Sequence, residues 1–351
     1  LSNERLRWVQ DKIQELKKKE IIQDSTSSWA SPCVVVPKSN GSFRLCVDYR
    51  EVNKQTELDP YPFPLIDDII DRFGGCTKFG KADLEDGFHL LGLTEETMKF
   101  TAFVTPFGHY EYQRLPFGWK NSPNIFMRFM NQQVLEKLDK NLKVGIFVDD
   151  IIWGGFNEEE CSETGCKVMR ALEEAGLKLN LKKCLFNVNS VPFCGRIIDG
   201  KTKKTKEESI EKVKRMKKPF DVHSLRCFTG LTGHFRAFIP KYADIVRPLD
   251  RLKQKDVPFE WTEQCEKSYQ QLVDIISQNP ILQSPDSRLP YELCCDASHY
   301  GTGSILYQRD STQKKPLQLR VIGYQSHTFT KAEQNYTVTE KEGLAVIKAI
   351  K

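Results

Sequence analysis

The sequence predicts an α+β protein that is divided into several modules. Its 351 residues, 40.5 kDa in mass, exceed one ordinary domain. Apolar residues recur at helical spacing in some segments and form alternating or β-branched runs in others, so both helices and strands are expected. The content of 39% hydrophobic and 28% charged residues is typical of a soluble globular protein. No apolar run approaches the roughly 20 residues of a membrane span, and no signal-peptide pattern follows Leu1, so we expect a protein inside a cell or particle.

Residues 3–73 predict two helices that flank a β-hairpin. The first helix covers 3–21, where apolar residues have helical spacing. Residues 33–36 and 42–49 alternate as strands around a turn rich in polar residues and glycine. The prolines in 59–64 require an extended segment, because each proline moves the residue before it out of helical backbone angles. Residues 65–73 then return to a helix.

Two further helices flank a pair of strands in the middle of the chain. Residues 123–138 carry apolar side chains at a spacing that suits a helix under a sheet, and 158–175 predict a helix that Gly176 ends. Between them, 144–148 and 151–155 are rich in β-branched and aromatic residues, which predicts two strands that meet in a tight turn.

The tight turn carries two adjacent carboxylates, Asp149 and Asp150. Like charges held together at the end of buried strands are costly unless a cation neutralises them. Magnesium is the obvious candidate, because it takes oxygen ligands and keeps water and substrate phosphates as the others. Taken alone, the pair is better explained as an ordinary Asp-Asp turn on the surface.

A third carboxylate, Asp83, changes this balance. It ends the short segment 79–83, which could be the end of a buried strand, and a turn-like Asp86–Gly87 follows it. Neighbouring strands could bring Asp83 beside Asp149. Three carboxylates around two metal ions is the arrangement needed for in-line displacement at phosphorus, in which one ion activates a 3′-oxygen and the other steadies the leaving pyrophosphate. The sequence therefore predicts nucleotidyl transfer.

The cysteines and histidines predict neither a disulfide framework nor a zinc site. Eleven cysteines is an odd count without paired metal-ligand spacing, and the adjacent Cys294 and Cys295 cannot easily bridge each other. A reduced compartment is therefore expected. His223 and Cys227 form only half of a zinc site.

The net charge of +5 is modest but unevenly distributed. Basic residues crowd 201–218, and Lys17–Lys19 form a smaller cluster. Local basic stripes bind polyanions by releasing counterions, so 201–218 could follow a phosphate backbone. Acidic residues at 207, 208 and 211 interleave with the lysines, as on a solvated helix face. Composition leaves both interpretations open.

Four motifs in order resemble those of reverse transcriptases, above all the enzymes of gypsy-class long-terminal-repeat retrotransposons and their retroviral relatives. The motifs are RLCVDYREVN at 44–53, Asp83 with Phe88, LPFGWKNSP at 115–123 and FVDD at 147–150. Two downstream blocks, at 231–261 and 291–345, extend the resemblance over nearly the whole chain. It also favours nucleic acid as the partner of the basic segment.

The resemblance implies a right-hand polymerase fold with fingers, palm and thumb, followed by a truncated ribonuclease H-like α/β domain. The implied boundaries are fingers at 1–57 and 91–121, palm at 58–90 and 122–200, thumb at 201–280, and a partial ribonuclease H-like domain at 288–351.

The same resemblance implies roles for single residues. Asp83 and Asp149 would be direct metal ligands, with Asp150 as a supporting carboxylate. Phe88 would reject a ribose 2′-hydroxyl by collision, with core packing as the alternative role. The residues expected to bind the incoming deoxynucleotide are Lys38, Arg44, Asp86, Gly87, Phe88 and Phe117. The expected primer grip is Phe193, Cys194, Gly195 and Arg196, and Lys182 or Lys183 would protonate pyrophosphate.

Two positions depart from the retroviral pattern. Phe147 stands where tyrosine is commonest, so it lacks a hydroxyl for nucleic acid. Phe117 replaces the usual retroviral glutamine, which is the gypsy-class pattern and suggests stacking on the nucleotide. Neither residue would touch the metals.

The ribonuclease H-like domain is expected to lack nuclease activity. The resemblance matches only Asp296 and Glu342 of the four acidic positions that hold two metals in this family. The sequence also stops at Lys351 within a helical pattern that has no cap or breaker.

These features together predict an RNA- and DNA-templated DNA polymerase that uses two magnesium ions, or manganese in their place. Its expected partners are an RNA/DNA or DNA/DNA primer-template, deoxynucleotides, and a longer or shorter copy of itself in a homodimer or heterodimer. Its expected location is the cytoplasm, within virus-like particles, without membrane contact. The alternatives are a noncatalytic structural subunit of a reverse transcriptase dimer and a domesticated nucleic-acid-binding derivative of a retroelement.

Overall fold

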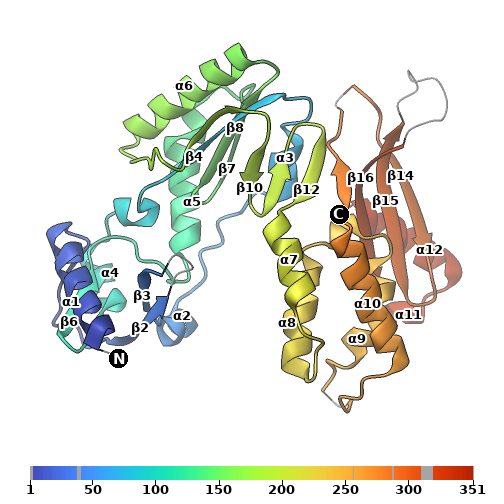
Figure 1. Ribbon diagram of the computed structural model, residues 1–351, viewed down its shortest axis with the longest axis horizontal. Coiled ribbons are helices and arrows are strands. Elements are labelled where there is room, and N and C mark those ends of the chain that lie inside the picture. Colours follow the sequence, from blue (N-terminus) through green and yellow to red (C-terminus); the bar gives the residue numbers. More distant parts are fainter. Residues whose placement is uncertain (1–2, 38–40, 256, 287, 310–318, 351) are drawn as a thin grey trace. The chain divides into compact units, whose positions relative to one another are not determined.

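A computed structural model describes residues 3–37, 41–255, 257–286, 288–309 and 319–350 (Figure 1). The chain divides into two compact units, each of which mixes helices and strands, as expected for an α+β protein. The first unit consists of Leu1–Ile69, Gly80–Trp153 and Glu159–Phe186. The second consists of Ile70–Phe79, Gly154–Glu158 and Asn187–Lys351.

The first unit begins with a helix packed on a five-stranded sheet. The helix α1 (Asn3–Lys18) buries Val9, Ile13 and Leu16, which lie on one helical face, against Phe103 and Tyr112 of the sheet. The strand order is β1 (Ile22–Asp24), β6 (Gly108–Tyr112), β5 (Phe103–Thr105), β2 (Ser31–Pro37) and β3 (Phe43–Val47). The expected first helix and the β2–β3 hairpin are present, whereas the short strands β1, β5 and β6 were not predicted.

A second sheet in the chain has four strands. Their order is β7 (Lys143–Phe147), β8 (Asp150–Gly155), β4 (Lys78–Asp83) and β9 (Leu185–Val188). Helices α5 (Ser122–Gln133) and α6 (Glu158–Glu174) contribute buried residues to the same hydrophobic core as these strands (Figure 1). The acidic residues that the sequence analysis singled out, Asp83, Asp149 and Asp150, lie at or next to strand ends of this sheet.

The predicted helix over 123–138 is shorter in the structure. Helix α5 ends at Gln133 because Val134 adopts φ −121° and ψ −63°, outside the helical region, with its side chain fully buried in the core. A single 3-10 turn, Leu135–Lys137, follows. The helix therefore ends five residues before the predicted end, although the apolar spacing continues.

Short helices connect the sheets of the first unit. They are α2 (Arg50–Gln55), α3 (Ile66–Asp71, which crosses the boundary between the units), η1 (Gly87–Leu90), α4 (Glu95–Met98) and η2 (Lys99–Thr101). Helix α3 lies inside the predicted range 65–73, and residues 59–64 form no helix, as their prolines require.

The part of the second unit that follows residue 190 begins with a small sheet and the helices α7 to α10. The sheet order is β10 (Val191–Phe193), β11 (Arg196–Ile198), β12 (Thr202–Thr205) and β13 (Ile281–Gln283). The helices are α7 (Glu207–Arg215), α8 (Val222–Gly233), α9 (Tyr242–Arg251) and α10 (Glu263–Ser277), with the 3-10 turn η4 (Arg236–Phe238) between α8 and α9. Phe228, Leu249 and Leu272 form the centre of the helical core.

The end of the second unit is an antiparallel sheet with two helices. Strands β14 (Glu292–Ala297), β15 (Gly301–Arg309) and β16 (Leu319–Thr328) are adjacent in sequence order, and α11 (Lys331–Gln334) and α12 (Val338–Ile350) follow them. Helix α12 packs on β14 and β15. In the described ranges no helix is both long and apolar enough to cross a membrane.

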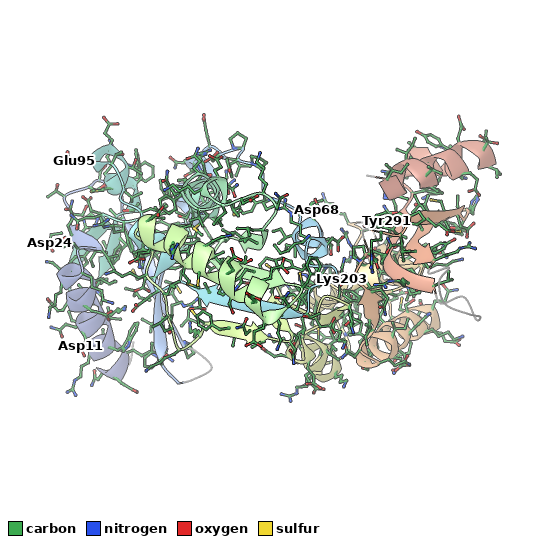
Figure 2. All side chains as sticks on the ribbon, turned by 90° about the horizontal axis from the view of Figure 1, so that it is seen from above. Asp11, Asp24, Asp68, Glu95, Lys203 and Tyr291 are labelled. Carbon is green, nitrogen blue, oxygen red and sulfur yellow. The ribbon has the colours of Figure 1, made fainter. Side chains whose placement is uncertain are left out.

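The basic segment 201–218 is not a single exposed stripe. Lys203 on β12 is buried and forms an ion pair with Asp71 (its position is labelled in Figure 2). The expectation that the whole segment follows a phosphate backbone is therefore wrong for Lys203, because the alternation of β12 turns its side chain inward. The remaining basic side chains of the segment are exposed or half-buried.

Trp153 on β8 is the largest fully buried side chain, and two glycines make room for it. A Cβ atom on Gly80 would overlap the Trp153 ring, and one on Gly165 would lie 2.7 Å from its Nε1. Because Gly80 is on β4 and Gly165 is on α6, the Trp153 ring fills the space between strand and helix.

We expect Gly80→Ala to destabilise the chain by about 1–3 kcal/mol, because a methyl group must displace a buried ring. Gly230→Ala is the matched control, since an added Cβ there meets nothing within 4 Å and the site is exposed on α8. That variant should be neutral or more stable by up to about 1 kcal/mol. Urea unfolding measures both, and equal midpoints for the two variants would contradict the packing argument.

Candidate active site

Three carboxylates gather where β4 ends and β8 begins. Asp83 is the last residue of β4, Asp150 is the first residue of β8, and Asp149 lies in the turn before it. Strands β4 and β8 are neighbours in the sheet, so the chain brings Asp83 beside residues that are distant from it in sequence. The predicted placement of the three acids at neighbouring strand ends is present in the structure.

The turn between β7 and β8 is fixed by an uncommon backbone conformation. Val148 has a φ of 56°, in the left-handed region, which costs a residue with a Cβ roughly 1–2 kcal/mol. The side chain of Val148 is half-buried against the core, and its N–H donates to Met127 Sδ at 3.4 Å. Such a strained residue persists only where its surroundings hold it, and it commonly marks a functional turn. Sequence reasoning missed Val148, since a β-branched residue gives no signal for this conformation.

Two lysines compensate two of the three carboxylates. Lys81, on β4, donates to Asp150 Oδ1 at 2.5 Å, and the Lys183 ammonium lies 3.3 Å from Asp83 Oδ1. The Lys81 side chain is only 13% exposed, so its ion pair with Asp150 is shielded from water. The sequence analysis named Lys182 or Lys183 as a proton donor to pyrophosphate and missed Lys81. The contact of Lys81 with Asp150 could not be predicted, because it depends on the pairing of β4 with β8.

Asp149 carries the least compensated charge of the three. In the described part of the chain it forms no ion pair, and the residue is exposed at the surface although its carboxyl is partly desolvated. Partial desolvation raises the pKa of Asp149, and the negative charges of Asp150 and Asp83 raise it further. The three carboxylates are therefore close enough to act on one another.

The residue types at this strand end fit a divalent cation, because three carboxylates offer hard oxygen ligands and a bound cation would favour the ionised form of Asp149. In the described residues, however, no three acidic, histidine or cysteine side chains are arranged as a ready metal cage. The Asp150 and Asp83 oxygens instead contact Lys81 and Lys183.

We expect Asp149→Asn to stabilise the metal-free chain slightly at pH 7. Folding raises the pKa of the Asp149 carboxyl, so this group lowers the free energy of unfolding when it is ionised in both the folded and the unfolded state. This cost disappears below the pKa that the same carboxyl has in the unfolded chain, about 3.9. The melting temperature should therefore be higher in the variant at pH 7 and equal to that of the parent near pH 3.5. An Asp149→Asn variant that is less stable than the parent at pH 7 would contradict the electrostatic cost assigned to the ionised Asp149 carboxylate.

The residues expected to bind deoxynucleotide are only partly gathered. Phe88 is buried, and its ring lies 4.8 Å from that of Phe117 and 5.0 Å from that of Phe126 between centroids. Phe117 itself is 53% exposed, so it offers an open aromatic face above Phe88. A Cβ on Gly87 would lie 3.3 Å from the Phe126 ring, which keeps this backbone close to the core.

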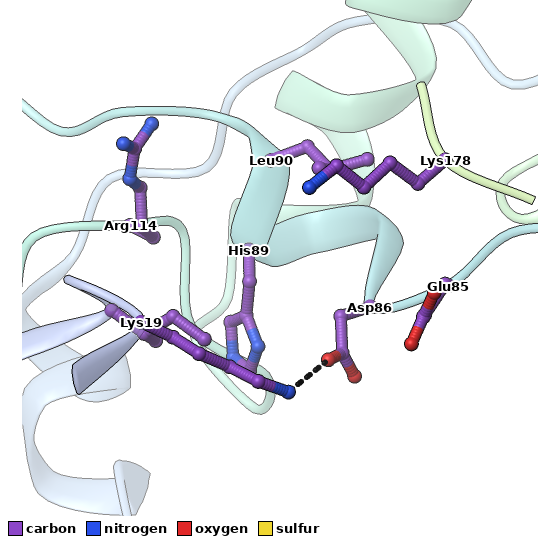
Figure 3. A pocket seen from close by; sticks show the side chains of 8 residues that line it. Lys19, Glu85, Asp86, His89, Leu90, Arg114 and Lys178 are labelled. Carbon is purple, nitrogen blue, oxygen red and sulfur yellow. Dashed lines mark ion pairs between the residues drawn. The ribbon is translucent and has the colours of Figure 1, made fainter. Parts of the chain in front are cut away.

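Two other residues that the resemblance assigns to nucleotide binding, Asp86 and Arg44, have different surroundings. The Asp86 side chain points into a neighbouring cavity, where it lies 3.9 Å from the Lys19 ammonium (Figure 3). Arg44 is exposed on β3. Lys38 lies outside the described residues.

Asn53 was missed as a positioning residue, although it belongs to a quoted motif. Its Nδ2 donates to the Gly118 carbonyl at 3.0 Å, and its Oδ1 accepts from the Lys120 N–H at 2.8 Å. These two bonds hold the loop that carries Phe117.

The expected primer grip forms a tight turn in the second unit. Phe193 and Arg196 are paired residues of β10 and β11, and the two residues between them have positive φ, 43° for Cys194 and 83° for Gly195. Positive φ at both central positions is typical of a type I′ hairpin. Arg196 lies over the Phe238 ring at 5.6 Å, so its guanidinium is oriented by an aromatic face.

The two acids of the ribonuclease H-like segment lie on adjacent elements. Asp296 is on β14, Glu342 is on α12, and these elements pack together. Asp296 lies 3.6 Å from the Lys241 ammonium. Within the described ranges they are not joined by a third acidic side chain in a metal-binding group.

Two family models match parts of the chain. Residues 36–199 match the reverse transcriptase (RNA-dependent DNA polymerase) family. Residues 261–351 match the ribonuclease H-like domain found in reverse transcriptase.

The similar curated proteins are polyproteins of transposons. The chain is 33% identical over 348 residues to the retrovirus-related Pol polyprotein from transposon 412 of Drosophila melanogaster, covering 97% of this chain and 28% of that protein. It is 35% identical over 350 residues to that of transposon 297 of Drosophila melanogaster, covering 98% and 32%. It is 33% identical over 347 residues to the transposon Tf2-3 polyprotein of Schizosaccharomyces pombe, covering 99% and 26%. The chain therefore spans about a third or less of these relatives.

Solved structures of foamy viral protease-reverse transcriptase share the fold. One in complex with double-stranded DNA has a TM-score of 0.82 at 26% identity, covering 97% of this chain and 59% of that chain. One in complex with an RNA/DNA hybrid has a TM-score of 0.83 at 24% identity, covering 100% and 46%, and supports the fold alone.

Proposed function

The chain belongs to the reverse transcriptase family, and from this premise we propose that it is the RNA- and DNA-templated DNA polymerase of a gypsy-class retroelement. The observation that carries the proposal is the meeting of Asp83, Asp149 and Asp150 at neighbouring strand ends. Its reaction is the joining of a deoxynucleotide to a primer 3′-hydroxyl, with pyrophosphate as the leaving group.

Asp83 and Asp149 are the proposed metal ligands, and Asp150 supports them. Two magnesium ions, or manganese, would stabilise the charge that develops on the attacking and leaving oxygens. Asp149 is exposed and has no ion pair in the described residues, so its oxygens are accessible to a cation. Lys81 holds Asp150 in place, and Lys183 lies beside Asp83, where its ammonium could give a proton to pyrophosphate.

The sheets support the proposed division into fingers and palm. Every strand of the five-stranded sheet falls in 1–57 or 91–121, and every strand of the β7–β8–β4–β9 sheet falls in 58–90 or 122–200. Helices α7 to α10 occupy the proposed thumb, 201–280, and the last sheet occupies 288–351.

The proposed partners are a primer-template and deoxynucleotides. A relative in the same family was solved with double-stranded DNA, which supports a duplex partner for this chain. Pairing with another copy of the chain, and a location in the cytoplasm within virus-like particles, remain predictions of the sequence resemblance.

We expect Asp149→Asn to reduce primer extension by about 100-fold or more, because loss of one charge removes electrostatic stabilisation of the transition state. Affinity for primer-template should change little, since phosphate contacts are distributed over the surface. Asp11→Asn is the matched control, as Asp11 is exposed on α1 (labelled in Figure 2). Extension on an RNA template with magnesium is the measurement, and near-normal extension by the first variant would exclude Asp149 as a ligand.

The basic segment supplies a second test. Lys201, Lys206 and Lys217 have no ion pair in the described residues, whereas Lys212 and Lys214 pair with glutamates of α7. Replacing the three unpaired lysines by glutamine should weaken primer-template binding and lower its salt slope by up to roughly one unit for each phosphate contact.

The control for this charge change is Lys267→Gln, at an exposed lysine of α10 that pairs with Glu263. It should leave the slope unchanged. An unchanged slope in the triple variant as well would place the phosphate contacts elsewhere.

Phe88 tests sugar selection. If its ring meets the sugar, Phe88→Val should raise ribonucleotide insertion relative to deoxynucleotide insertion by about tenfold or more, because the rejecting element is steric. Phe88 also packs on Phe126, so the variant will lose some stability. Single-nucleotide insertion kinetics separate the two effects, since lost packing alone leaves the ratio of the two efficiencies constant.

A further inference from the structure

We propose that Phe63 is a positioning residue for the turn that carries Asp149, and that side chains of α5 hold it there through the extended segment 57–63. The rings of Phe63 and Phe147 lie 5.8 Å apart between centroids, tilted by 56°. Phe147 is the last residue of β7 and lies shortly before Asp149 in the chain. All of these residues belong to the first unit. The inference rests on the proposed function, because it concerns the placement of a proposed metal ligand.

The extended segment cannot be held by regular sheet pairing. Its prolines, and the one that follows it, have no N–H, so the segment cannot donate a continuous row of backbone hydrogen bonds. Residues 57–65 form neither helix nor strand in the structure. The remaining polar groups of this backbone must therefore find partners on another element.

Helix α5 and the residue before it supply these partners from one face. The polar side chains recur at intervals of three and four residues, which places them in a row along a helix. The row consists of Asn121, Asn124, Arg128 and Asn131. Asn121 Nδ2 donates to the Glu57 carbonyl at 2.8 Å, and its Oδ1 accepts from the Asp59 N–H at 3.1 Å. Asn124 Nδ2 donates to the Asp59 carbonyl at 2.8 Å.

The other two members of the row hold the side chains of Asp59 and Tyr61. Arg128 Nη2 donates to Asp59 Oδ1 at 2.6 Å, and the same oxygen accepts from the Tyr61 N–H at 3.1 Å. The Asp59 side chain is only 13% exposed, so this ion pair is shielded from water. The Arg128 guanidinium also lies 4.9 Å from the centre of the Tyr61 ring, and Asn131 Nδ2 donates to the Tyr61 hydroxyl at 2.6 Å.

Phe63 follows directly from this anchored part of the segment. Tyr61 and Phe63 both pack against the hydrophobic core to which α5 contributes its buried apolar residues. An aromatic pair is stabilised beyond the burial of its area and prefers particular orientations, so the Phe63 ring restricts where the Phe147 ring can lie. The position of Phe63 is in turn decided by the hydrogen bonds of the row.

Helix α5 reaches the same turn by a second, direct contact. The Val148 N–H donates to Met127 Sδ at 3.4 Å, and Met127 is the neighbour of Arg128 in the helix. Val148 has a φ of 56°, and a strained conformation persists only where its surroundings hold it. Phe147 and Val148 are therefore held from the same helix, one through Phe63 and the other through Met127.

The first test measures amide exchange of the turn by mass spectrometry in the full chain, without metal or nucleic acid. Phe63→Leu keeps an apolar side chain but removes the ring, so residues 147–150 should exchange about fivefold faster or more. Asn124→Ala should have the same effect, since it releases the segment that carries Phe63. Phe129→Leu is the matched control and should leave this exchange unchanged. It removes a half-buried ring of α5 that packs on the same core and lies 6.3 Å from the Phe126 ring.

The second test is the kinetics of single-nucleotide insertion. Phe63→Leu and Asn124→Ala should each lower kcat by about tenfold or more, because misplaced reacting groups slow the chemical step. The KM for deoxynucleotide should change by less than about threefold. The double variant should lose about as much as the weaker single variant, since both substitutions act through the same contact. Phe129→Leu should keep the kcat of the parent.

The outcomes separate this inference from the proposed function. Unchanged exchange of the turn in Phe63→Leu would overturn the inference. Faster exchange with an unchanged kcat would overturn it too, as would losses in kcat that multiply in the double variant. A parent chain that extends no primer would instead refute the proposed function, and the exchange measurement would still decide whether Phe63 holds the turn.

Discussion

The pairing of β8 with both β7 and β4 is the constraint on which the rest of the site depends. It places the last residue of one strand beside the first residue of another, and Asp83 meets Asp150 for that reason alone. Trp153 fixes the layer beneath, because its ring fills the space that Gly80 and Gly165 leave open. The carboxylates at the strand ends therefore stand on a rigid, close-packed base, which is how a site keeps its geometry without a ligand.

Electrostatic cost is concentrated at this strand end. Three like charges share a small region, and the chain compensates them unequally: Lys81 pairs with Asp150, Lys183 lies near Asp83, and Asp149 stays exposed with a raised pKa. Val148 adds backbone strain immediately before Asp149. A carboxylate that is unfavourable by itself becomes favourable once a cation binds, so the same feature that costs stability supports the proposed chemistry.

Basic residues show how burial divides a uniform sequence pattern. In the segment 201–218, Lys203 is buried against Asp71, Lys212 and Lys214 pair within α7, and Lys201 lacks an ion pair in the described residues. The tertiary structure thus decides which basic side chains of this segment are left without an ion pair in the described residues.

The sequence by itself determined the local elements and the residue types of the site. The α+β class, the first helix, the β2–β3 hairpin, the helix ending before Gly176 and the paired strands around Asp149 all follow from short-range periodicity and turn chemistry. Even the meeting of Asp83 with Asp149 could be anticipated, since both follow or precede strand-like segments.

Only the tertiary structure decided what each side chain touches. The end of α5 at Gln133, the burial of Lys203, the left-handed Val148 and the Lys81–Asp150 pair depend on neighbours that are remote in sequence. Periodicity describes one face of one element and carries no information about the element that will cover it. Long-range packing overrides local preference for that physical reason, and it does so most strongly at the strand ends where the proposed chemistry lies.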